Sequence, residues 1–408
     1  MASLLAQLPG PINLRLVLSD TKFADILHDL VTAKGNRFGV PRVLAVDRNE
    51  TRELAGTLHI EGANKDNAIA QIRAINALVT VGSTTLTLKS RDATNSVTLN
   101  ILPSRGVSQP LDELFELPGA HVLASCPFSF TCEPYAYGPA VVIFNEIVVA
   151  PCLLDLGTVP GDYPAPLDMQ FLTNSTGFHA IYCGLQRPGS ADDIGSYKRQ
   201  AEEMYWTGGA TTIADKASAN GGRVVWNNST DYARGGMFDD VSPGTYMLLT
   251  RLYVDGAGNC GYVKETLTGQ FAYPDSDAFD LYEMGSAHLP AQRMYAGQQV
   301  SQHDVMMSSG IAGGGNIVAL DYAAFVPTSW GYWRWHPAER GAWATKLNVI
   351  GDGGVYEGDI GSLANFRGAP VSCVGPSKLV LFAEDAQQAQ GCQLNLSVAV
   401  TPRYTLWA

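Results

Sequence analysis

Charge is scarce in this chain of 408 residues: only 16% are Asp, Glu, Lys or Arg, and together they give a formal net charge of -12. No cluster of Lys and Arg offsets the negative charge locally. An acidic surface repels nucleic-acid backbones and anionic membrane surfaces. We therefore expect no nucleic-acid partner.

Long apolar runs are also lacking, since no segment approaches the roughly 20 uninterrupted apolar residues of a membrane helix. The N-terminal stretch MASLLAQLPGPINLRLVL has no basic leader, and Pro9 and Pro11 interrupt its apolar patch. The sequence therefore predicts neither membrane insertion nor a secretion signal. Seven cysteines, an odd number, fit reduced and buried thiols better than a disulfide framework.

Glycine and proline are abundant, with 42 and 22 residues. Together with the low charge they favour many short strands joined by tight turns over helical bundles. The length is too great for one ordinary core, so two or three domains are expected. The predicted fold class is all-β, with several β-sandwich domains.

The stretch CPFSFTCEPYAYG, residues 126–138, has two cysteines six positions apart. In a strand, Cys126 and Cys132 share one face but lie roughly 20 Å apart, whereas a disulfide needs Cα atoms within roughly 7 Å. A shared metal fails for the same reason. The pattern predicts a half-buried strand with Phe128 and Phe130 on the cysteine face and Ser129 and Thr131 opposite. The proline and glycine that follow predict a domain junction near Gly138.

One helix and several strands are predicted before this junction. In NKDNAIAQIRAINALVTVG, apolar residues recur at helical spacing at Ile69, Ile72, Ile75 and Val79, and Asn and Asp residues cap the start. We expect a helix that packs over a sheet and ends at Gly82. The predicted strands are residues 12–18, 42–48, 53–62, 84–90, 96–104 and 121–133.

Composition divides the chain into three predicted domains. Residues 1–140 form the N-terminal domain with its single helix. Residues 141–178 and 343–408 form a discontinuous second β-sandwich, and residues 179–342 form an inserted module. Within this module TYMLLTRLYV has the nearly continuous hydrophobicity of a sandwich-core strand.

The aromatic stretch SWGYWRWHP is the sharpest candidate for a binding site. Flat rings beside polar donors suit the faces of sugars, but Trp, Tyr and Arg are also enriched at interfaces. Alternation sets Tyr332 apart from the face that Trp333 and Trp335 share. Its position just before the second sandwich resumes favours packing at a seam, between domains or between subunits. The candidate residues are Trp330, Tyr332, Trp333, Arg334 and Trp335.

Catalytic and metal-binding patterns are weak. The stretch DSDAFDLYE offers carboxylates for a glycoside hydrolase pair, at Asp275, Asp277, Asp280 and Glu283. Exposed loop acids are the more usual explanation. DGAGN at 255–259 and GDGGVYEGD at 351–359 offer oxygen ligands for calcium, but they lack EF-hand spacing and favour hairpin turns. We expect no enzyme activity, no cofactor and no metal site.

The order of several short motifs resembles that of the distal tail and minor tail proteins of long-tailed bacteriophages. ELAGTLHIEG, a helix, TTLTL and FTCEPYAYG resemble the belt domain of that family. LDLGTVPGDYPAPLDMQF resembles the start of its second domain, and LNVIGDGGVY, VGPSKLVLFAED and VAVTPRYTLW resemble its end. The inserted PGTYMLLTRLYV, MGSAHLP and LDYAAFVP resemble jelly-roll modules of the concanavalin or carbohydrate-binding kind.

The resemblance implies a structural protein of the phage tail in the virion, made in the cytoplasm of the host bacterium. It implies a homo-oligomeric ring of six or three copies at the tail tip, which joins the tail tube and hub to the receptor-binding protein. The large insert leaves open whether the chain is the ring itself or an accessory tip subunit. The alternative is a glycan-binding, lectin-like protein of the virion that recognises a host saccharide, and a third reading is a polysaccharide-degrading enzyme.

Overall fold

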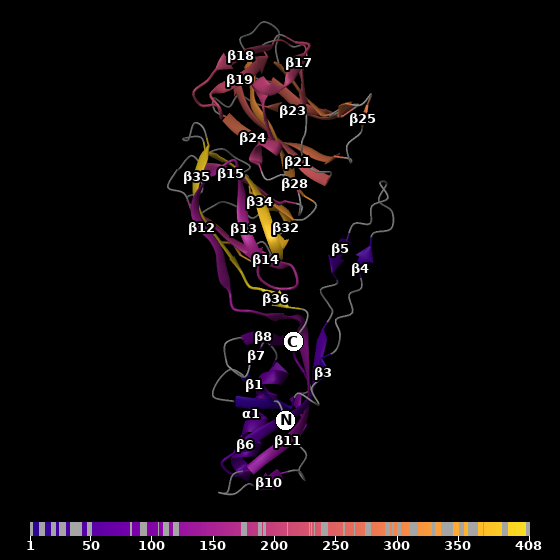
Figure 1. Ribbon diagram of the computed structural model, residues 1–408, viewed down its shortest axis with the longest axis vertical. Coiled ribbons are helices and arrows are strands. Elements are labelled where there is room, and N and C mark those ends of the chain that lie inside the picture. The colour runs from indigo at the N-terminus through magenta and orange to yellow at the C-terminus, as the bar shows by residue number, and fades with distance from the viewer. Residues whose placement is uncertain are drawn as a thin grey trace. The chain divides into compact units, whose positions relative to one another are not determined.

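The computed structural model of the chain (Figure 1) consists almost entirely of β-strands, with one α-helix among the residues it describes. This confirms the predicted all-β class with several sandwiches. Side chains are described only from Thr51 onward. The structure describes residues 3–7, 13–17, 22–23, 30–32, 43–46, 51–81, 84–89, 96–104, 106–108, 114–116, 122–172, 178–186, 190, 193–209, 211–227, 229, 231, 233–237, 244–255, 258–264, 266–273, 279–289, 294–295, 298–299, 303–309, 317–328, 331–335, 346–350, 355–357, 366–369, 371–385 and 391–404.

The chain forms two compact units. The first comprises Met1–Ala140, Gly161–Tyr163 and Thr401–Ala408, and the second comprises Val141–Pro160 and Pro164–Val400. Each unit has its own buried cluster of apolar side chains.

The first unit is built on one antiparallel sheet that closes on itself. The strands β6, β11, β8, β7, β1 and β2 pair in a closed cycle, because β11 pairs with β8 as well as with β6. The strands of this unit are β1 (Ser3–Gln7), β2 (Asn13–Val17), β3 (Lys22–Phe23), β4 (Leu30–Thr32), β5 (Val43–Val46), β6 (Arg52–Gly62), β7 (Thr84–Lys89), β8 (Ser96–Ile101), β9 (Gly106–Val107), β10 (Leu114–Glu116), β11 (Val122–Tyr137) and β36 (Arg403–Tyr404).

Strand β11 confirms the alternation expected for residues 126–132. Cys126, Phe128, Phe130 and Cys132 are buried, while Ser129 on the other face is only half-buried. The strand does not end at the proline, as we predicted, but continues to Tyr137. Its register shifts between Cys132 and Ala136, and this irregularity accommodates Pro134, which has no N–H to donate to a ladder.

The predicted helix is α1 (Lys65–Val81). The backbone N–H of Asn67 donates to the Asn64 side chain at 2.8 Å, so an Asn caps the start as expected. Ile72, Ile75 and Val79 are buried against the sheet, whereas Ile69 is only half-buried. Gly82, the predicted end, lies outside the described residues.

The last described strand corrects one predicted boundary. We assigned residues 343–408 to the second sandwich, but β36 pairs with the end of β11 and belongs to the first unit. The backbone N–H of Gly138 donates to the carbonyl of Pro402 at 2.9 Å. A Cβ at Gly138 would lie 3.1 Å from the Tyr404 ring, so the returning segment packs directly on this glycine.

The second unit contains the predicted second sandwich, which is made of two antiparallel sheets. One sheet has the order β12-β35-β14-β30-β31 with β33 beside β14, and the other has the order β13-β34-β15-β29-β32. Their strands are β12 (Val141–Ala150), β35 (Cys392–Val400), β14 (Ala165–Leu172), β30 (Lys346–Ile350), β31 (Val355–Glu357), β33 (Ser372–Cys373), β13 (Cys152–Val159), β34 (Gly375–Asp385), β15 (Phe178–Leu185), β29 (Tyr332–Trp335) and β32 (Phe366–Ala369).

Two further sheets form the insert. One has the order β18-β19-β28-β21-β24 with β16 beside β28, and the other has the order β17-β20-β27-β22-β23. The elements of the insert are η1 (Ile194–Ser196), β16 (Lys198–Gln200), η2 (Ala201–Glu203), β17 (Tyr205–Thr207), β18 (Thr211–Asp215), β19 (Arg223–Asn227), β20 (Ala233–Met237), β21 (Gly244–Asp255), β22 (Gly258–Lys264), β23 (Thr266–Tyr273), β24 (Phe279–Leu289), β25 (Met294–Tyr295), β26 (Gln298–Gln299), β27 (His303–Ser309) and β28 (Ile317–Pro327).

The insert is shorter at both ends than the predicted span 179–342. Strands β15 and β29 lie within that span, yet both pair within a sheet of the second sandwich. In β15 the side chains of Ile181 and Cys183 lie in the sandwich core, while Tyr182 lies in the cluster that continues into the insert. The sheet is therefore covered on both faces, and strands of this kind lack the alternation that marks a domain boundary.

Within the described part of the chain, no helix is long and apolar enough to cross a bilayer. Six cysteines are present as free thiols, and the Cys260 side chain lies outside the description. Burial raises the pKa of the Cys132 and Cys152 thiols to about 12, which makes them unreactive.

Candidate functional site

The aromatic stretch that we singled out lies only partly within the described residues. Trp330 lies outside them. Trp333 and Trp335 are in β29, where their backbones pair with Cys183 and Ile181, but their side chains are not described. Glycan binding by these three tryptophans stays a prediction.

Tyr332 and Arg334 lie at the seam between the second sandwich and the insert. Their shared partner is Glu283 in β24 of the insert: the Tyr332 hydroxyl donates to its Oε1 at 3.0 Å, and Arg334 Nε lies 2.5 Å from the same oxygen. Burial, and then the negative charge of Glu283, raise the pKa of Tyr332. These two side chains therefore join two layers of the second unit.

Of the four carboxylates considered for a hydrolase pair, the described part of the chain contains Asp280 and Glu283. Asp275 and Asp277 lie outside it. Asp280 is buried and accepts a hydrogen bond from the backbone N–H of Leu281 at 2.9 Å. Glu283 contacts Tyr332 and Arg334 as described above, so this acid has a structural role.

The two calcium candidates differ in their structure. DGAGN does not form the hairpin that we predicted, because β21 and β22 on either side of it belong to different sheets. GDGGVYEGD does include a hairpin, in which β30 pairs with β31 around residues 351–354. No group of three His, Cys, Asp or Glu is placed to hold a metal among the residues that the structure describes.

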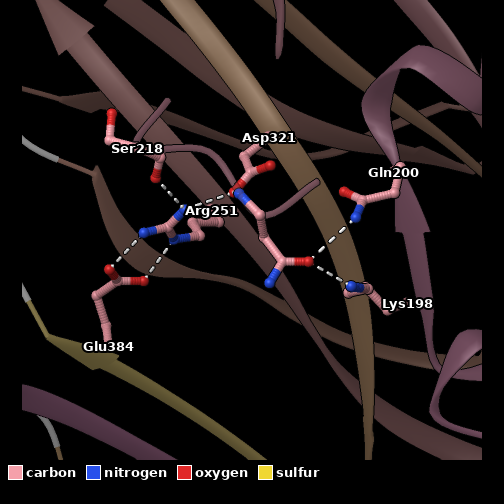
Figure 2. Close-up of polar contacts among 7 residues, drawn as sticks. Lys198, Gln200, Ser218, Arg251, Asp321 and Glu384 are labelled. Atoms are coloured by element: carbon pink, nitrogen blue, oxygen red, sulfur yellow. Dashed lines mark hydrogen bonds and ion pairs between the residues drawn. The ribbon is translucent and has the colours of Figure 1, made fainter. Parts of the chain in front are cut away.

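Among the residues that the structure describes, one deeply buried polar cluster is a feature that the sequence reasoning missed. We call Arg251, Asp321 and Glu384 the seam triad, because β21 and β28 belong to the insert whereas β34 belongs to the second sandwich (Figure 2). The three side chains are only 4%, 0% and 3% exposed, respectively.

The guanidinium of Arg251 uses most of its donors within the triad. Nε and Nη2 donate to the two oxygens of Glu384 at 2.7 and 2.8 Å, in bidentate geometry. Nη1 donates to Asp321 Oδ2 at 2.6 Å and to the carbonyl of Ser218 at 3.0 Å. The ring of Phe279 lies 4.5 Å from the guanidinium carbon, at cation–π distance.

A β-bulge presents Asp321 to the triad. Arg251 pairs with Tyr322 and Leu252 pairs with Leu320, so Asp321 is the extra residue on β28. A bulge of this kind redirects a side chain that regular pairing would place elsewhere. The backbone N–H of Asn220 also donates to Asp321 Oδ2, at 2.9 Å.

Asn220 extends the network toward β16. Its Oδ1 accepts hydrogen bonds from Lys198 Nζ at 2.6 Å and from Gln200 Nε2 at 3.1 Å (Figure 2). Burial lowers the pKa of Lys198, while the charge of Asp321 opposes that effect. The network therefore links a second cation to the triad through one residue, because the Asn220 side chain binds Lys198 and its backbone N–H binds Asp321.

The single guanidinium of Arg251 pairs with two carboxylates, and the pKa values of Asp321 and Arg251 are both shifted. Burial raises the pKa of Asp321 to about 6, although Arg251 works in the opposite direction. Burial alone would lower the pKa of Arg251, but the hydrogen bonds and charge of Glu384 raise it. The Oδ1 atom of Asp321 has no hydrogen-bond partner within the described structure, which agrees with the poor stabilisation of its charged form.

A signal for the triad was present in the sequence. Arg251 interrupts the apolar run TYMLLTRLYV, Asp321 interrupts IVALDYAAFV, and Glu384 ends the apolar part of KLVLFAED. A charge inside a core strand must find a partner, because an unpaired buried charge costs several kcal/mol. A charge within or at the end of the apolar run of three core strands therefore predicts an ion-pair network, although not which strands meet.

The arrangement of these groups is typical of a structural contact between two modules and not of a catalytic site. The acids of the seam triad are buried beside their own cation, and Glu283 is held by Tyr332 and Arg334. A general acid or base must reach a substrate proton within hydrogen-bond distance. Buried groups that already have partners instead fix the position of the insert on the second sandwich.

Comparisons with known proteins give little further guidance. No protein-family model and no curated protein matches the chain. Among solved structures, it is similar to a xanthan lyase from Paenibacillus, with 12% identity and a TM-score of 0.26 over 86% of this chain and 35% of the lyase. The chain thus covers about a third of that enzyme.

Two glycoside hydrolases give similar values. An exo-β-1,3-galactanase from Phanerochaete chrysosporium has 13% identity and a TM-score of 0.23, over 59% of this chain and 78% of that one. A family 43 arabinoxylan arabinofuranohydrolase from Bacillus subtilis has 13% identity and a TM-score of 0.25, over 67% and 65%. TM-scores this low carry no argument about function.

Proposed function

We propose that the chain is a structural component of a bacteriophage tail tip, of the distal tail or minor tail kind. In this role it assembles with copies of itself into a ring of six or three subunits that joins the tail tube to the receptor-binding apparatus. Its place is the tail of the virion, after synthesis in the cytoplasm of the host bacterium. The role requires no catalytic centre.

The seam triad is the observation that carries the proposal. In the proposed role the modules of the chain hold fixed positions relative to one another. In the second unit, a buried bidentate ion pair between Arg251 and Glu384 fastens the insert to the second sandwich. The apolar cluster around it is continuous across the same seam. This construction favours a rigid scaffold over a hinged enzyme.

The motif EPYAY in the first unit gives a second, local support. Glu133 accepts hydrogen bonds from Asn100 Nδ2 at 2.8 Å and from the Tyr137 hydroxyl at 2.7 Å. Tyr135 stacks on Tyr163 with ring centroids 4.4 Å apart, and the guanidinium of Arg403 lies 5.3 Å from the Tyr135 ring. The motif that carries the resemblance to tail proteins thus anchors the returning C-terminal strand.

The first test is the mass of the purified full-length protein by size exclusion with light scattering, followed by electron microscopy of the eluted particles. We expect closed rings of three or six copies. We also propose that the first unit carries the ring contacts, because closed rings need complementary patches on two sides of a subunit. Ala74→Arg on the exposed face of α1 should then release monomers, whereas Ile213→Arg on β18 of the insert should not.

A monomer at all accessible concentrations would contradict self-assembly into a ring. In that case a glycan array becomes the next measurement, with Trp333→Ala and Trp335→Ala as variants. Saccharide binding that both substitutions abolish in folded protein would support the lectin-like alternative. Binding without turnover would separate it from a polysaccharide-degrading enzyme.

A further inference from the structure

Strand β12 is a long edge strand. It pairs with β35 from Val141 to Ala150, and no strand pairs with its other side among the residues described. The N–H and C=O groups along such an edge form a template for another extended chain. Natural proteins usually block edges of this length with charges, bulges or covering loops.

The outward face of β12 is apolar where an edge strand is normally polar. Val142, Ile147 and Val149 are 60%, 64% and 58% exposed. Their partners on β35 are Ala399, Asn395 and Gln393. The exposed apolar side chains of Val142, Ile147 and Val149 therefore belong to the edge strand alone and do not continue across the sheet. A strand added at this edge would lie beside them and cover them.

A groove of about 730 Å³ lies beside this edge, between β12 and β13. β12 and β13 are edge strands of the two sheets of the second sandwich. Both edges lie on the same side of the sandwich. The charged residues of the lining are Glu146 and Asp155, and both are acidic. The groove therefore favours an occupant that carries positive charge.

Strand β13 is less suited than β12 to accept a partner. Its register shifts between Asp155 and Thr158, and Gly157 has a φ of 65°. The carboxylate of Asp155 accepts a hydrogen bond from the backbone N–H of Gly157 at 2.8 Å, which fixes this bulge. A bulge interrupts the ladder that an added strand would need. The register of β12 also shifts, but near its start, between Val142 and Phe144, so the stretch from Phe144 to Ala150 is the regular edge that can accept a strand.

We propose that β12 binds an extended segment of a different polypeptide, added as an antiparallel or parallel strand, in which apolar residues alternate with Lys or Arg. Main-chain hydrogen bonds would supply affinity, and alternate side chains would supply specificity. The apolar residues cover Val142, Ile147 and Val149, and the basic ones face Glu146. A second copy fits poorly, because β12 has the sequence VVIFNEIVVA, which contains an acid and no cation.

The inference goes beyond the proposed role in the tail tip, because it concerns a partner other than the ring neighbour. A synthetic peptide of about nine residues, the length of an ordinary strand, serves as the probe. It alternates valine with lysine and threonine, has blocked ends and carries a fluorophore. We expect saturable binding to the full-length protein by fluorescence anisotropy, and at least about tenfold weaker binding of the same peptide with glutamate in place of lysine.

Two variants test the location. Glu146→Lys should reverse the preference, so that the glutamate peptide binds more tightly than the lysine peptide. Ile147→Lys should weaken binding of the lysine peptide by about tenfold or more. Ile213→Lys is the matched control, since Ile213 is 54% exposed on β18, an edge strand of another sheet. It should bind the peptide like the unmodified protein.

Three results would overturn the proposal. These are the absence of binding, equal binding of the two peptides to the unmodified protein, and an unchanged preference in folded Glu146→Lys protein. A dimer of the unmodified chain that Ile147→Lys dissociates would also overturn it, in favour of a second copy at β12. The peptide comparison needs no variant, so it stays decisive even if a substitution impairs folding.

Discussion

At the scale of single residues, Arg251 is the side chain that joins the two acids of the seam triad. Arg251→Met removes the only guanidinium that contacts both Asp321 and Glu384 in the seam triad. Two carboxylates then remain buried without it, and breaking a buried pair in this way costs about 3–5 kcal/mol. We expect the free energy of unfolding of the second unit to fall by that amount in denaturant titrations.

The exposed ion pair between Arg223 and Asp215 is the matched control. Its side chains are 58% and 87% exposed, and the two atoms that join them lie 3.2 Å apart. Exposed pairs are worth less than about 1 kcal/mol, so Arg223→Met should leave stability nearly unchanged. Equal effects of the two arginine substitutions would show that burial of the seam triad does not matter.

Asp321 predicts a pH dependence of stability. Its pKa in the folded protein is about 6, above the usual value of 3.8, so the folded state binds the proton more tightly than the unfolded state. By linkage, this group adds stability as the pH falls from 6 to about 4 and costs stability above pH 6. The difference in unfolding free energy between the unmodified protein and Asp321→Asn should therefore grow in favour of the unmodified protein over that range. A difference that stays constant with pH would contradict the assignment.

At the scale of elements, the contact between α1 and β9 depends on one amide. Asn76 Nδ2 donates to the carbonyl of Val107 at 3.0 Å, and the N–H of Val107 donates back to Asn76 Oδ1 at 2.6 Å. Gly106, with a φ of 82°, lets the strand approach, because a Cβ there would overlap the same amide oxygen. The helix thus serves as a partner for a two-residue strand.

Asn76→Ala should destabilise the first unit by about 1–3 kcal/mol, because it leaves two half-buried backbone groups without partners. The gain in helix propensity, at most about 0.7 kcal/mol, offsets only part of this loss. Thr80→Ala, at an exposed position of the same helix, should be neutral or slightly stabilising. Urea unfolding of both variants measures the difference, and similar midpoints would rule out the role given to the Asn76 amide.

Local patterns predicted the elements well, and they failed where pairing partners decide the structure. Alternation identified β11, and helical spacing identified α1. The sequence did not reveal that β36 returns to β11, or that β15 and β29 belong to the second sandwich. These pairings join residues far apart in the chain, and a strand covered on both faces gives no alternation to follow.

The candidate site shows the same limit. Aromatic composition drew attention to Tyr332 and Arg334, which do lie at a seam, but their partner Glu283 had been considered for catalysis instead. Arg251 and its two acids are conspicuous in the sequence only as isolated charges in apolar runs. Their meeting depends on the bulge at Asp321 and on the stacking of two sheets, and neither has a local sequence signature.

At the scale of the whole molecule, the structure predicts two unfolding transitions. The second sandwich and the insert share one apolar cluster and the seam triad, whereas the first unit has a separate core. Scanning calorimetry should resolve two cooperative transitions, and Arg251→Met should lower only the one that belongs to the second unit. Three transitions would mean that the insert unfolds independently and that the seam does not couple it to the sandwich.

The return of β36 to the first unit has a consequence for biosynthesis. A ribosome makes β11 early, but Arg403 and Tyr404 leave it only after the entire second unit has been translated. The first unit therefore gains the cation at Tyr135 and the hydrogen-bond acceptor of Gly138 only once residues 401–404 have been translated. A polypeptide released before residue 401 would lack this strand, so its first unit would stay unfinished even though all of β11 had been made.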